Sequence, residues 1–279
     1  MARWVRFPHY GALQLTFAVI LSTIFLLSFI SPVVAQILHT IAWENQGFAN
    51  GATIPSGTTL TASTSPAVSG ALTATLTYST NGTYTVAPTL TFNSGVVGAH
   101  TGLLFISYEV GANPNPATQF VTFNLSFSRS VYGLSFDLLD IDRRGEATSW
   151  EDAVIVTYNA GVNVRSTPAV YTLAGPCVVE GTVLVANDGF VGNSTNNPGL
   201  CINGNNDALA NGNIRFNFGN IPVSSVTVRY SPGPTAPNPS GEQHIGISDI
   251  TFTMSDFGDA PASYGDASHA LPTTISNYL

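Results

Sequence analysis

Most of the side chains in this sequence that could do chemistry are carboxylates, and they are concentrated in one short stretch. Six of the sixteen acidic residues fall between positions 137 and 152. Closely spaced carboxylates on a loop between strands can supply the oxygen ligands of Ca²⁺, which takes roughly six to eight of them. The sequence therefore predicts a calcium site, whose candidate ligands are Asp137, Asp140, Asp142, Glu151 and Asp152.

The spacing of the aspartates indicates which of them could act together. Along a strand, Asp140 and Asp142 point to the same face and Asp137 points to the opposite one. The alternative is a loop without metal, in which Arg143 and Arg144 neutralise the aspartates. The D-x-D-x-D-G order of an EF-hand loop is absent, so the sequence leaves both interpretations open.

No arrangement typical of an enzyme accompanies these carboxylates. Glu151 and Asp152 are adjacent and would face opposite sides of a strand, whereas the two carboxyl groups of a retaining glycosidase lie about 5–5.5 Å apart. The sequence has no G-x-S-x-G motif, no G-x-G-x-x-G motif and no P-loop. His100, His244 and His269 have no recognisable catalytic partners. We therefore expect no enzymatic activity, and a glycoside hydrolase ranks third among the functions considered.

The composition is typical of a secreted β-protein. Only 9% of the residues are charged, the net charge is −8, and all eight basic residues are arginine. Nucleic acids and anionic membrane surfaces are bound through clustered basic side chains, which this chain lacks. We therefore expect neither as a partner. The hydrophobic fraction of 44% still allows the chain to bury a sizeable core.

Residues 1–35 have the pattern of a secretory signal peptide. Arg3 and Arg6 precede a nearly uninterrupted apolar run, Leu13–Ile30, and Val33–Ala35 then places small residues before a cleavage point. An uncleaved membrane anchor is the alternative, because roughly 20 apolar residues span a bilayer. In either case the remainder is exported, and we expect a secreted or cell-surface protein.

The residues after the signal segment have the pattern of strands rather than helices. In Phe120–Phe127, every second residue from Val121 onward is apolar, and the residues between are Thr, Asn and Ser. Such alternation gives a strand one buried and one exposed face. We therefore predict an all-β fold, a jelly-roll-like antiparallel β-sandwich over residues 36–255. Strands are expected at Ile37–Trp43, Thr59–Ser63, Ala71–Ser79, Thr83–Phe92, Leu103–Val110, Phe120–Phe127, Val131–Leu139, Ala153–Tyr158, Val162–Arg165, Ala169–Leu173, Thr182–Val185, Ile214–Phe218, Val223–Tyr230 and Ile245–Met254.

One turn carries a strong local signal. Asn81 and Gly82 lie between the predicted strands Ala71–Ser79 and Thr83–Phe92. Asn-Gly favours positive φ at both central positions of a two-residue turn. The sequence therefore predicts that these two strands form a hairpin.

The two cysteines, Cys177 and Cys201, lie in the loop-rich segment Gly175–Gly212. In an exported protein an even pair is expected to be oxidised. On the chain-entropy model such a bridge stabilises the fold by roughly 3 kcal/mol. Two free buried thiols are the alternative, and a metal site is disfavoured because no histidine lies nearby.

Two stretches resemble segments of large, adhesin-like bacterial surface proteins. The first, LSFDLLDIDRRG followed by WEDAVIV, is similar to the F-x-x-x-D-I-D…D-x-V-x-V signature of a β-sandwich domain. The second, DFGDAPASYG with His269 after it, is similar to the segment that commonly precedes a GEVED-type module. The resemblance implies location and architecture rather than activity, with residues 256–279 as a linker or the start of a following module. The residues that match the first signature are Phe136, Asp140, Ile141, Asp142, Asp152, Val154 and Val156.

These observations favour a non-catalytic structural or adhesive interaction domain, with a surface glycan or a protein as its partner. We expect Ca²⁺ to stabilise it at the segment from Asp140 to Asp152, which we call the acidic loop. A carbohydrate-binding module is the main alternative, because such modules present aromatic rings beside polar groups. Trp150 and Tyr158 are the candidate ligand contacts, with Trp43 and Tyr171 as further aromatic candidates. Trp150 could instead close the core edge beneath the acidic loop. A cleft lined by tryptophan and paired carboxylates would favour sugar binding or hydrolysis, and a closed sandwich would favour the interaction domain.

Overall fold

The computed structural model describes most of the chain after the predicted signal segment. The described residues are 37–65, 72–143, 150–183, 186–193, 201, 209–236, 238, 240–256 and 269–270. All of them belong to one compact unit, Gln36–Leu279. The predicted signal peptide and most of the predicted tail lie outside the described residues. Within the described ranges, no helix combines the length and the apolar character of a membrane span.

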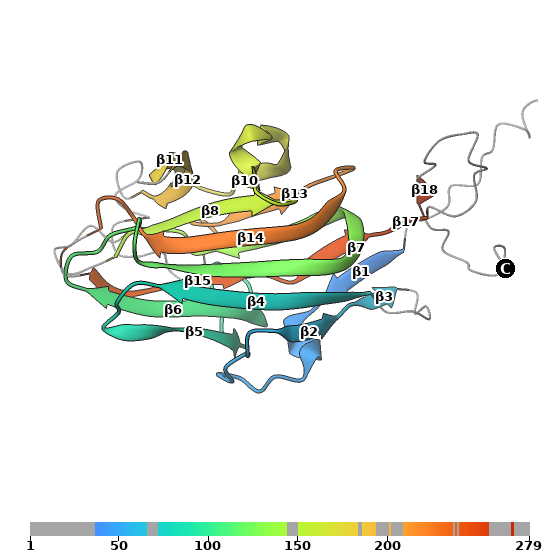
Figure 1. Ribbon diagram of the computed structural model, residues 1–279, viewed down its shortest axis with the longest axis horizontal. Coiled ribbons are helices and arrows are strands. Elements are labelled where there is room, and N and C mark those ends of the chain that lie inside the picture. Colours follow the sequence, from blue (N-terminus) through green and yellow to red (C-terminus); the bar gives the residue numbers. More distant parts are fainter. Residues whose placement is uncertain are drawn as a thin grey trace, which may run out of the picture. The chain divides into compact units, whose positions relative to one another are not determined.

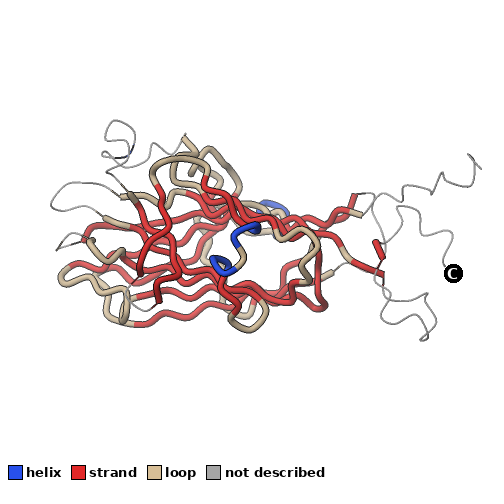
Figure 2. The backbone as a smooth tube through the Cα atoms, turned by 90° about the horizontal axis from the view of Figure 1, so that it is seen from above, coloured by secondary structure: helices blue, strands red, loops and turns tan. Residues whose placement is uncertain are grey.

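The described residues form the antiparallel all-β fold that the sequence predicts, and strands dominate it (Figure 2). The helical segments with described bounds are short 3-10 turns: η1 (Trp43–Gln46), η2 (Val164–Ser166) and η3 (Pro168–Val170). The strands are β1 (Leu38–Ile41), β2 (Thr58–Thr61), β3 (Ser63–Ser65), β4 (Thr73–Asn81), β5 (Val86–Asn93), β6 (Leu103–Gly111), β7 (Phe120–Leu139), β8 (Asp152–Tyr158), β9 (Val162–Asn163), β10 (Tyr171–Leu173), β11 (Val178–Val183), β12 (Ala186–Gly192), β13 (Ile214–Asn217), β14 (Val223–Pro232), β15 (Ser240–Ile247), β16 (Ile250–Thr253), β17 (Ser255–Asp256) and β18 (His269–Ala270).

The two sheets of the sandwich share one strand, β7, which is 20 residues long. Its first half pairs with β4 on one side and β14 on the other (Figure 1). This first sheet continues from β4 to β2, and from β14 through β8 and β12 to β11. The second half of β7 pairs with β13 on one side and with β15 and β16 on the other. This second sheet continues to β10 beyond β13, to β6 and β5 beyond β15, and to β1 and β3 beyond β16.

β7 changes from one sheet to the other next to Gly133. The φ of Gly133 is +57°, and its N–H donates a 2.5 Å hydrogen bond to the carbonyl of Gly219, which lies between β13 and β14. In this left-handed region a side chain costs about 1–2 kcal/mol, because Cβ crowds the following carbonyl oxygen. Glycine has no Cβ, so it lets one continuous strand serve both sheets.

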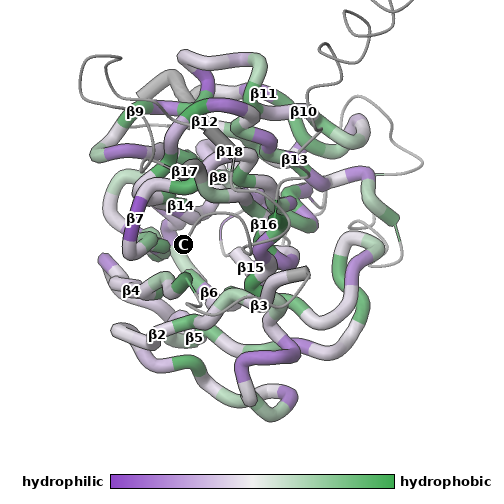
Figure 3. Tube along the Cα trace, turned by 90° about the vertical axis from the view of Figure 1, so that its right-hand side faces the viewer, coloured by the Kyte–Doolittle hydropathy of each residue, from purple (hydrophilic) through white to green (hydrophobic). Residues whose placement is uncertain are grey.

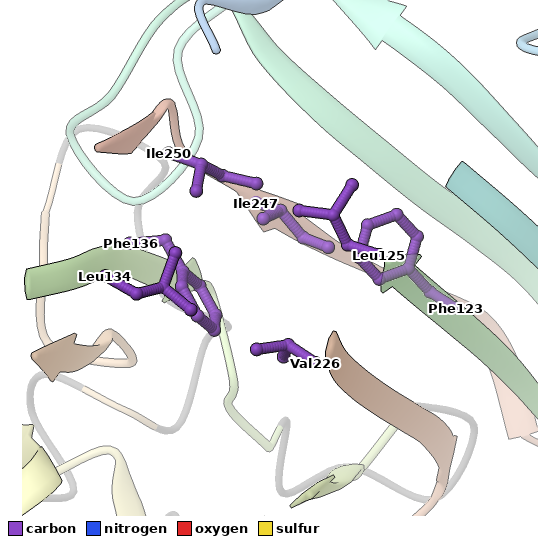
Figure 4. Close-up of a pocket in the computed structure, with 7 residues that line it drawn as sticks. All are labelled: Phe123, Leu125, Leu134, Phe136, Val226, Ile247 and Ile250. Atoms are coloured by element: carbon purple, nitrogen blue, oxygen red, sulfur yellow. The ribbon is translucent and has the colours of Figure 1, made fainter. Parts of the chain in front are cut away.

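The core lies between the two sheets and is closely filled. Apolar and polar residues are interleaved along the strands (Figure 3). The apolar residues of this alternation are buried, so each sheet has an apolar inner face. Side chains from β7, β14, β15 and β16 converge there (Figure 4). The cavity that they leave has a volume of about 10 Å³, which is room for at most about one water molecule. The side chains that line it are Phe123, Leu125, Leu134, Phe136, Val226, Ile247 and Ile250.

The hairpin predicted at Asn81 and Gly82 is wrong. β4 pairs with β2 and β7, whereas β5 pairs with β6, so the two strands belong to different sheets. Gly82 does adopt a positive φ, +103°. Turn residues specify the local backbone conformation, whereas the pairing partner of a strand depends on which sheet can bury its apolar face.

Several strand boundaries also differ from the predicted ones. Phe120–Phe127 and Val131–Leu139 are one strand, because the pairing with β14 continues at Val131 after an irregularity at the polar residues between them. Ile245–Met254 is two strands, separated at Ser248 and Asp249. In place of a strand at Thr182–Val185, β11 and β12 pair with each other on either side of residues 184–185. Alternation locates apolar faces, whereas breaks and bulges depend on contacts between strands.

The predicted disulfide is confirmed. Cys177 and Cys201 are bonded, their Cα atoms are 5.4 Å apart, and 24 positions separate them in the sequence. Cys177 also exchanges backbone hydrogen bonds with neighbouring segments, accepting one from Asn193 at 2.7 Å and donating one to Asn211 at 3.1 Å. The bridge therefore connects a segment that is already anchored to the sheet with Cys201, 24 positions further along the chain.

The bend in β7 makes a testable prediction about Gly133. Replacing Gly133 by Ala should lower the free energy of unfolding by about 1–2 kcal/mol, because alanine disfavours the left-handed region. Replacing it by Asn should cost less, since asparagine tolerates that region. Urea unfolding of the two variants measures both values, and equal losses for Ala and Asn would contradict a backbone origin.

Candidate functional site

The acidic stretch runs from the end of β7 to the start of β8. β7 ends at Leu139, and Asp140 has a left-handed φ of +65°, which interrupts the alternation of a strand. All five predicted calcium ligands are buried, with exposed fractions of 1–5%. A buried carboxylate must be compensated by hydrogen bonds or opposite charge for its lost hydration. The partners of each carboxylate therefore define what this site can do.

Asp137 is held by two basic side chains. It faces away from the core, since its neighbours Phe136 and Leu138 are part of the core. Arg215 lies directly opposite on β13 and donates to both carboxylate oxygens, from Nε at 2.9 Å and from Nη2 at 2.8 Å. Nε2 of His100 lies 3.3 Å from Oδ2. Burial raises the pKa of Asp137, but the hydrogen bonds from Arg215 and His100 outweigh it and lower the pKa to about 2.

The buried carboxylate of Asp140 has protein partners for only one of its two oxygens within the described part of the chain. Its Oδ2 lies 3.1 Å from Nε2 of His244 on β15. Its backbone N–H donates to Oδ1 of Asn213 at 3.2 Å. Its other carboxylate oxygen, Oδ1, is buried and has no hydrogen-bond partner within the described part of the chain. Asp140 therefore retains an oxygen that could accept a further donor or a cation.

Asp142 and Asp152 form a coupled pair at the base of the loop. Nε1 of Trp150 donates to Oδ1 of Asp142 at 2.6 Å, which places the tryptophan against the acidic loop. The Tyr230 hydroxyl donates to Oδ1 of Asp152 at 2.6 Å, and the backbone N–H of Asp142 donates to Oδ2 at 3.4 Å. Burial and the charge of Asp142 raise the pKa of Asp152 well above its ordinary value. Asp152 thus has a strong tendency to keep its proton.

Glu151 is bound by a loop far away in the sequence. The backbone N–H and the hydroxyl of Thr235 each donate to one of its carboxylate oxygens at 2.6 Å. Arg143 adds an ion pair at 3.4 Å. Gly233 makes this approach possible, because a Cβ there would come within 2.3 Å of the Glu151 side chain. These contacts fix the start of β8 against the loop that follows β14.

An arginine does neutralise Asp137, but it is not one of the two arginines that the sequence suggested. Arg143 pairs with Glu151 rather than with an aspartate, and Arg144 lies outside the described residues. The arginine that neutralises Asp137 is Arg215, which is 78 positions away. No sequence signal identified Arg215, because only the register of β13 against β7 brings it there.

The calcium prediction stays a prediction. Among the described residues, no group of three or more His, Cys, Asp or Glu side chains is arranged to hold a metal ion. Protein donors occupy oxygens of all five candidate ligands, and within the described ranges Oδ1 of Asp140 is a buried carboxylate oxygen that has no donor.

Two of the aromatic candidates are core residues rather than surface contacts. Trp43 is fully buried, and its Nε1 donates to the Ser248 carbonyl at 2.9 Å. Tyr158 is 8% exposed, and its ring packs edge-on against Phe218 with 5.1 Å between ring centroids. A surface ligand cannot stack on these rings. Tyr158 is therefore corrected from a ligand contact to a core residue, because the inner face of β8 carries it into the sandwich.

The comparisons with known proteins add no functional assignment. No protein-family model matches the chain, and a search of curated proteins finds no match either. The function is therefore inferred from the arrangement of the side chains, and the resemblance to bacterial surface proteins stays an expectation.

The low pKa of Asp137 predicts how its ion pair responds to acid. Its folded pKa of about 2 lies below its ordinary value of 3.8. The carboxylate therefore stabilises the fold above the ordinary pKa, and this contribution is lost as the pH falls through about 2. This difference between the two pKa values corresponds to roughly 2 kcal/mol of folding free energy. We expect Asp137→Asn to lower the free energy of unfolding at neutral pH but to reduce its further decline between about pH 4 and pH 2.

Urea unfolding of the wild type and the variant across that pH range measures the difference. Glu180→Gln is a matched control, because Glu180 forms an exposed ion pair with Arg165 and should leave the acid profile unchanged. If Asp137→Asn declines as steeply as the wild type, the ion pair is not the acid-sensitive contact.

Proposed function

We propose that this protein is an exported, non-catalytic β-sandwich that acts as a structural or adhesive interaction module outside the cell. The observation that carries the proposal is that the buried carboxylates are engaged with protein donors and tie separate strands together. The side chains that were the strongest candidates for chemistry in the sequence thus stabilise the fold. The signal-like segment 1–35 and the resemblance to bacterial surface proteins support the extracellular location.

The burial of the adjacent pair Glu151 and Asp152 supports a non-catalytic role. Their exposed fractions are 2% and 1%. A general acid or base must lie within hydrogen-bonding reach of the substrate. The oxygens of these two residues accept hydrogen bonds from Thr235 and Tyr230 instead. A glycoside hydrolase that uses this pair is therefore disfavoured.

The way the sandwich is held together suits a protein that must persist outside the cell. The Cys177–Cys201 bridge is of a kind that oxidising compartments maintain. The closely filled core and the strand shared by both sheets bind the two layers into one cooperative unit. These features favour a rigid scaffold, which is what an adhesive surface requires.

The proposal predicts retention on a surface without chemical turnover. The full chain, expressed with its own N-terminal segment in a bacterial host, should be recovered from the exported fraction with its cysteines oxidised. Beads coated with it should be retained on films of neutral polysaccharide or of extracellular protein. Beads coated with reduced, denatured chain are the control. Release of reducing sugar from the films, or retention no greater than that of the control, would contradict the proposal.

Calcium binding at the acidic loop is a second proposal, and Oδ1 of Asp140 is the observation that favours it. A buried carboxylate oxygen without a donor is costly, and a cation would compensate it. His244 holds the other oxygen of Asp140, so the carboxylate is already oriented. Bound calcium would then stabilise the end of β7 in the exported protein.

Thermal unfolding with excess Ca²⁺ and with chelator tests this second proposal. Binding to the folded state alone should stabilise it by about 2.7 kcal/mol at a hundredfold excess over Kd. Asp140→Asn should abolish the shift, whereas Asp137→Asn should retain it, because Arg215 occupies both oxygens of Asp137. An absent shift in the wild type rules out calcium at this loop.

A further inference from the structure

The outer face of the second sheet carries a row of polar side chains across neighbouring strands. Thr172 of β10 lies opposite Arg215 of β13, and Arg215 lies opposite Asp137 of β7. Their alternation with core residues such as Phe136 and Phe216 turns them to the outer side. A second polar row runs beside the first: Asn217, Ser135 and Thr251.

Three hollows lie over this face, and Arg215 lines all of them. Their volumes are about 240, 350 and 360 Å³. His100 and Asp137 line the first two, and Thr172 lines the second and third. Because neighbouring hollows share their walls, we treat them as one groove, the Arg215 groove. Hollows of a few hundred Å³ are in the size range of small-ligand sites.

Arg215 is held in place for binding before any ligand arrives. Its Nε and Nη2 both donate to Asp137, which fixes the plane of the guanidinium group. The side chain is nevertheless 65% exposed. No hydrogen bond from its Nη1 is found within the described residues, so these donors remain available to a ligand. A fixed side chain loses little conformational entropy on binding, which favours affinity.

The charges of the groove favour a neutral ligand. Asp137 neutralises Arg215, and Asp249 lines the first hollow as a further carboxylate. The chain as a whole carries a net charge of −8, which repels anions. Hydroxyl and amide groups that can donate or accept hydrogen bonds also line the hollows, beside the His100 imidazole and apolar residues such as Ala174 and Val170. Tyr171 lines the third hollow, beside these polar groups.

We infer that the Arg215 groove is the ligand-binding face of the module and that it takes a neutral oligosaccharide. A sugar chain offers many hydroxyls to fixed donors and acceptors and brings no charge that must be compensated. This inference rests on the proposed function, because it names the partner class of the same interaction module. The expected ligand contacts are then the residues that line this groove, which do not include Trp150 or Tyr158.

The test is calorimetric titration of the exported full chain with neutral hexasaccharides: maltohexaose, cellohexaose, mannohexaose and chitohexaose. At least one of them should bind, and hexagalacturonate, which is anionic, should bind more weakly. Arg215→Ala should weaken the binding at least tenfold. Arg129→Ala is the matched control, because Arg129 is also an exposed arginine of a strand, here β7, does not line the hollows, and should leave the affinity unchanged.

Arg215→Ala leaves the buried Asp137 without its main partner and could therefore destabilise the fold. A second variant separates loss of binding from loss of folding. Thr172 is exposed, and its side chain makes no hydrogen bond within the described residues. Thr172→Leu should therefore fold normally, fill part of the groove and weaken binding as well. Thermal unfolding followed by circular dichroism verifies that each variant is folded.

The outcomes separate this inference from the proposed function. Sugar binding that survives both Arg215→Ala and Thr172→Leu would overturn the groove as the site. Retention of coated beads on protein films, without binding of any neutral hexasaccharide, would overturn the inference and leave the interaction module intact. Tighter binding of hexagalacturonate than of every neutral probe would overturn the neutral ligand class. A chain that binds no probe and is retained on no film would overturn both.

Discussion

The sandwich depends on β7 taking part in two sheets at once. Its first half is paired on both sides in one sheet and its second half on both sides in the other, so neither sheet can form its central ladder without it. The left-handed conformation of Gly133 is the condition for this arrangement. The strand then delivers its last residues, including Asp137, to the outer face of the second sheet and leads directly into the acidic loop.

A second constraint is the cost of burying charge. Five carboxyl groups leave water when the end of β7 and the start of β8 are covered; each requires a hydrogen-bonding or charged partner, and Asp152 in addition tends to keep its proton. Arg215, His244 and Tyr230 come from β13, β15 and β14, and these strands reach the site from different parts of the sequence. The acidic residues therefore act as junctions between strands, which favours a structural role over a catalytic one.

The same ion pair connects the fold with the inferred binding face. Asp137 is buried and compensated by Arg215, whereas Arg215 itself stays largely exposed in a polar groove. The buried Asp137 carboxylate holds the exposed guanidinium group of Arg215 in a fixed orientation and also neutralises its charge. On an acidic protein such a group suits the recognition of neutral hydroxyl-rich ligands better than the capture of anions.

The alternation of the strands, and therefore the all-β class, can be predicted from the sequence, as can the disulfide and the position of the acidic loop. These properties depend on residue type and short-range spacing, which any reader of the chain can see. Three features depend on contacts across the fold: β4 and β5 belong to different sheets, Phe120–Leu139 is one strand, and Arg215 rather than Arg143 neutralises Asp137. The physical reason is that strand partners and buried ion pairs are set by register between segments far apart in sequence, which local patterns do not encode.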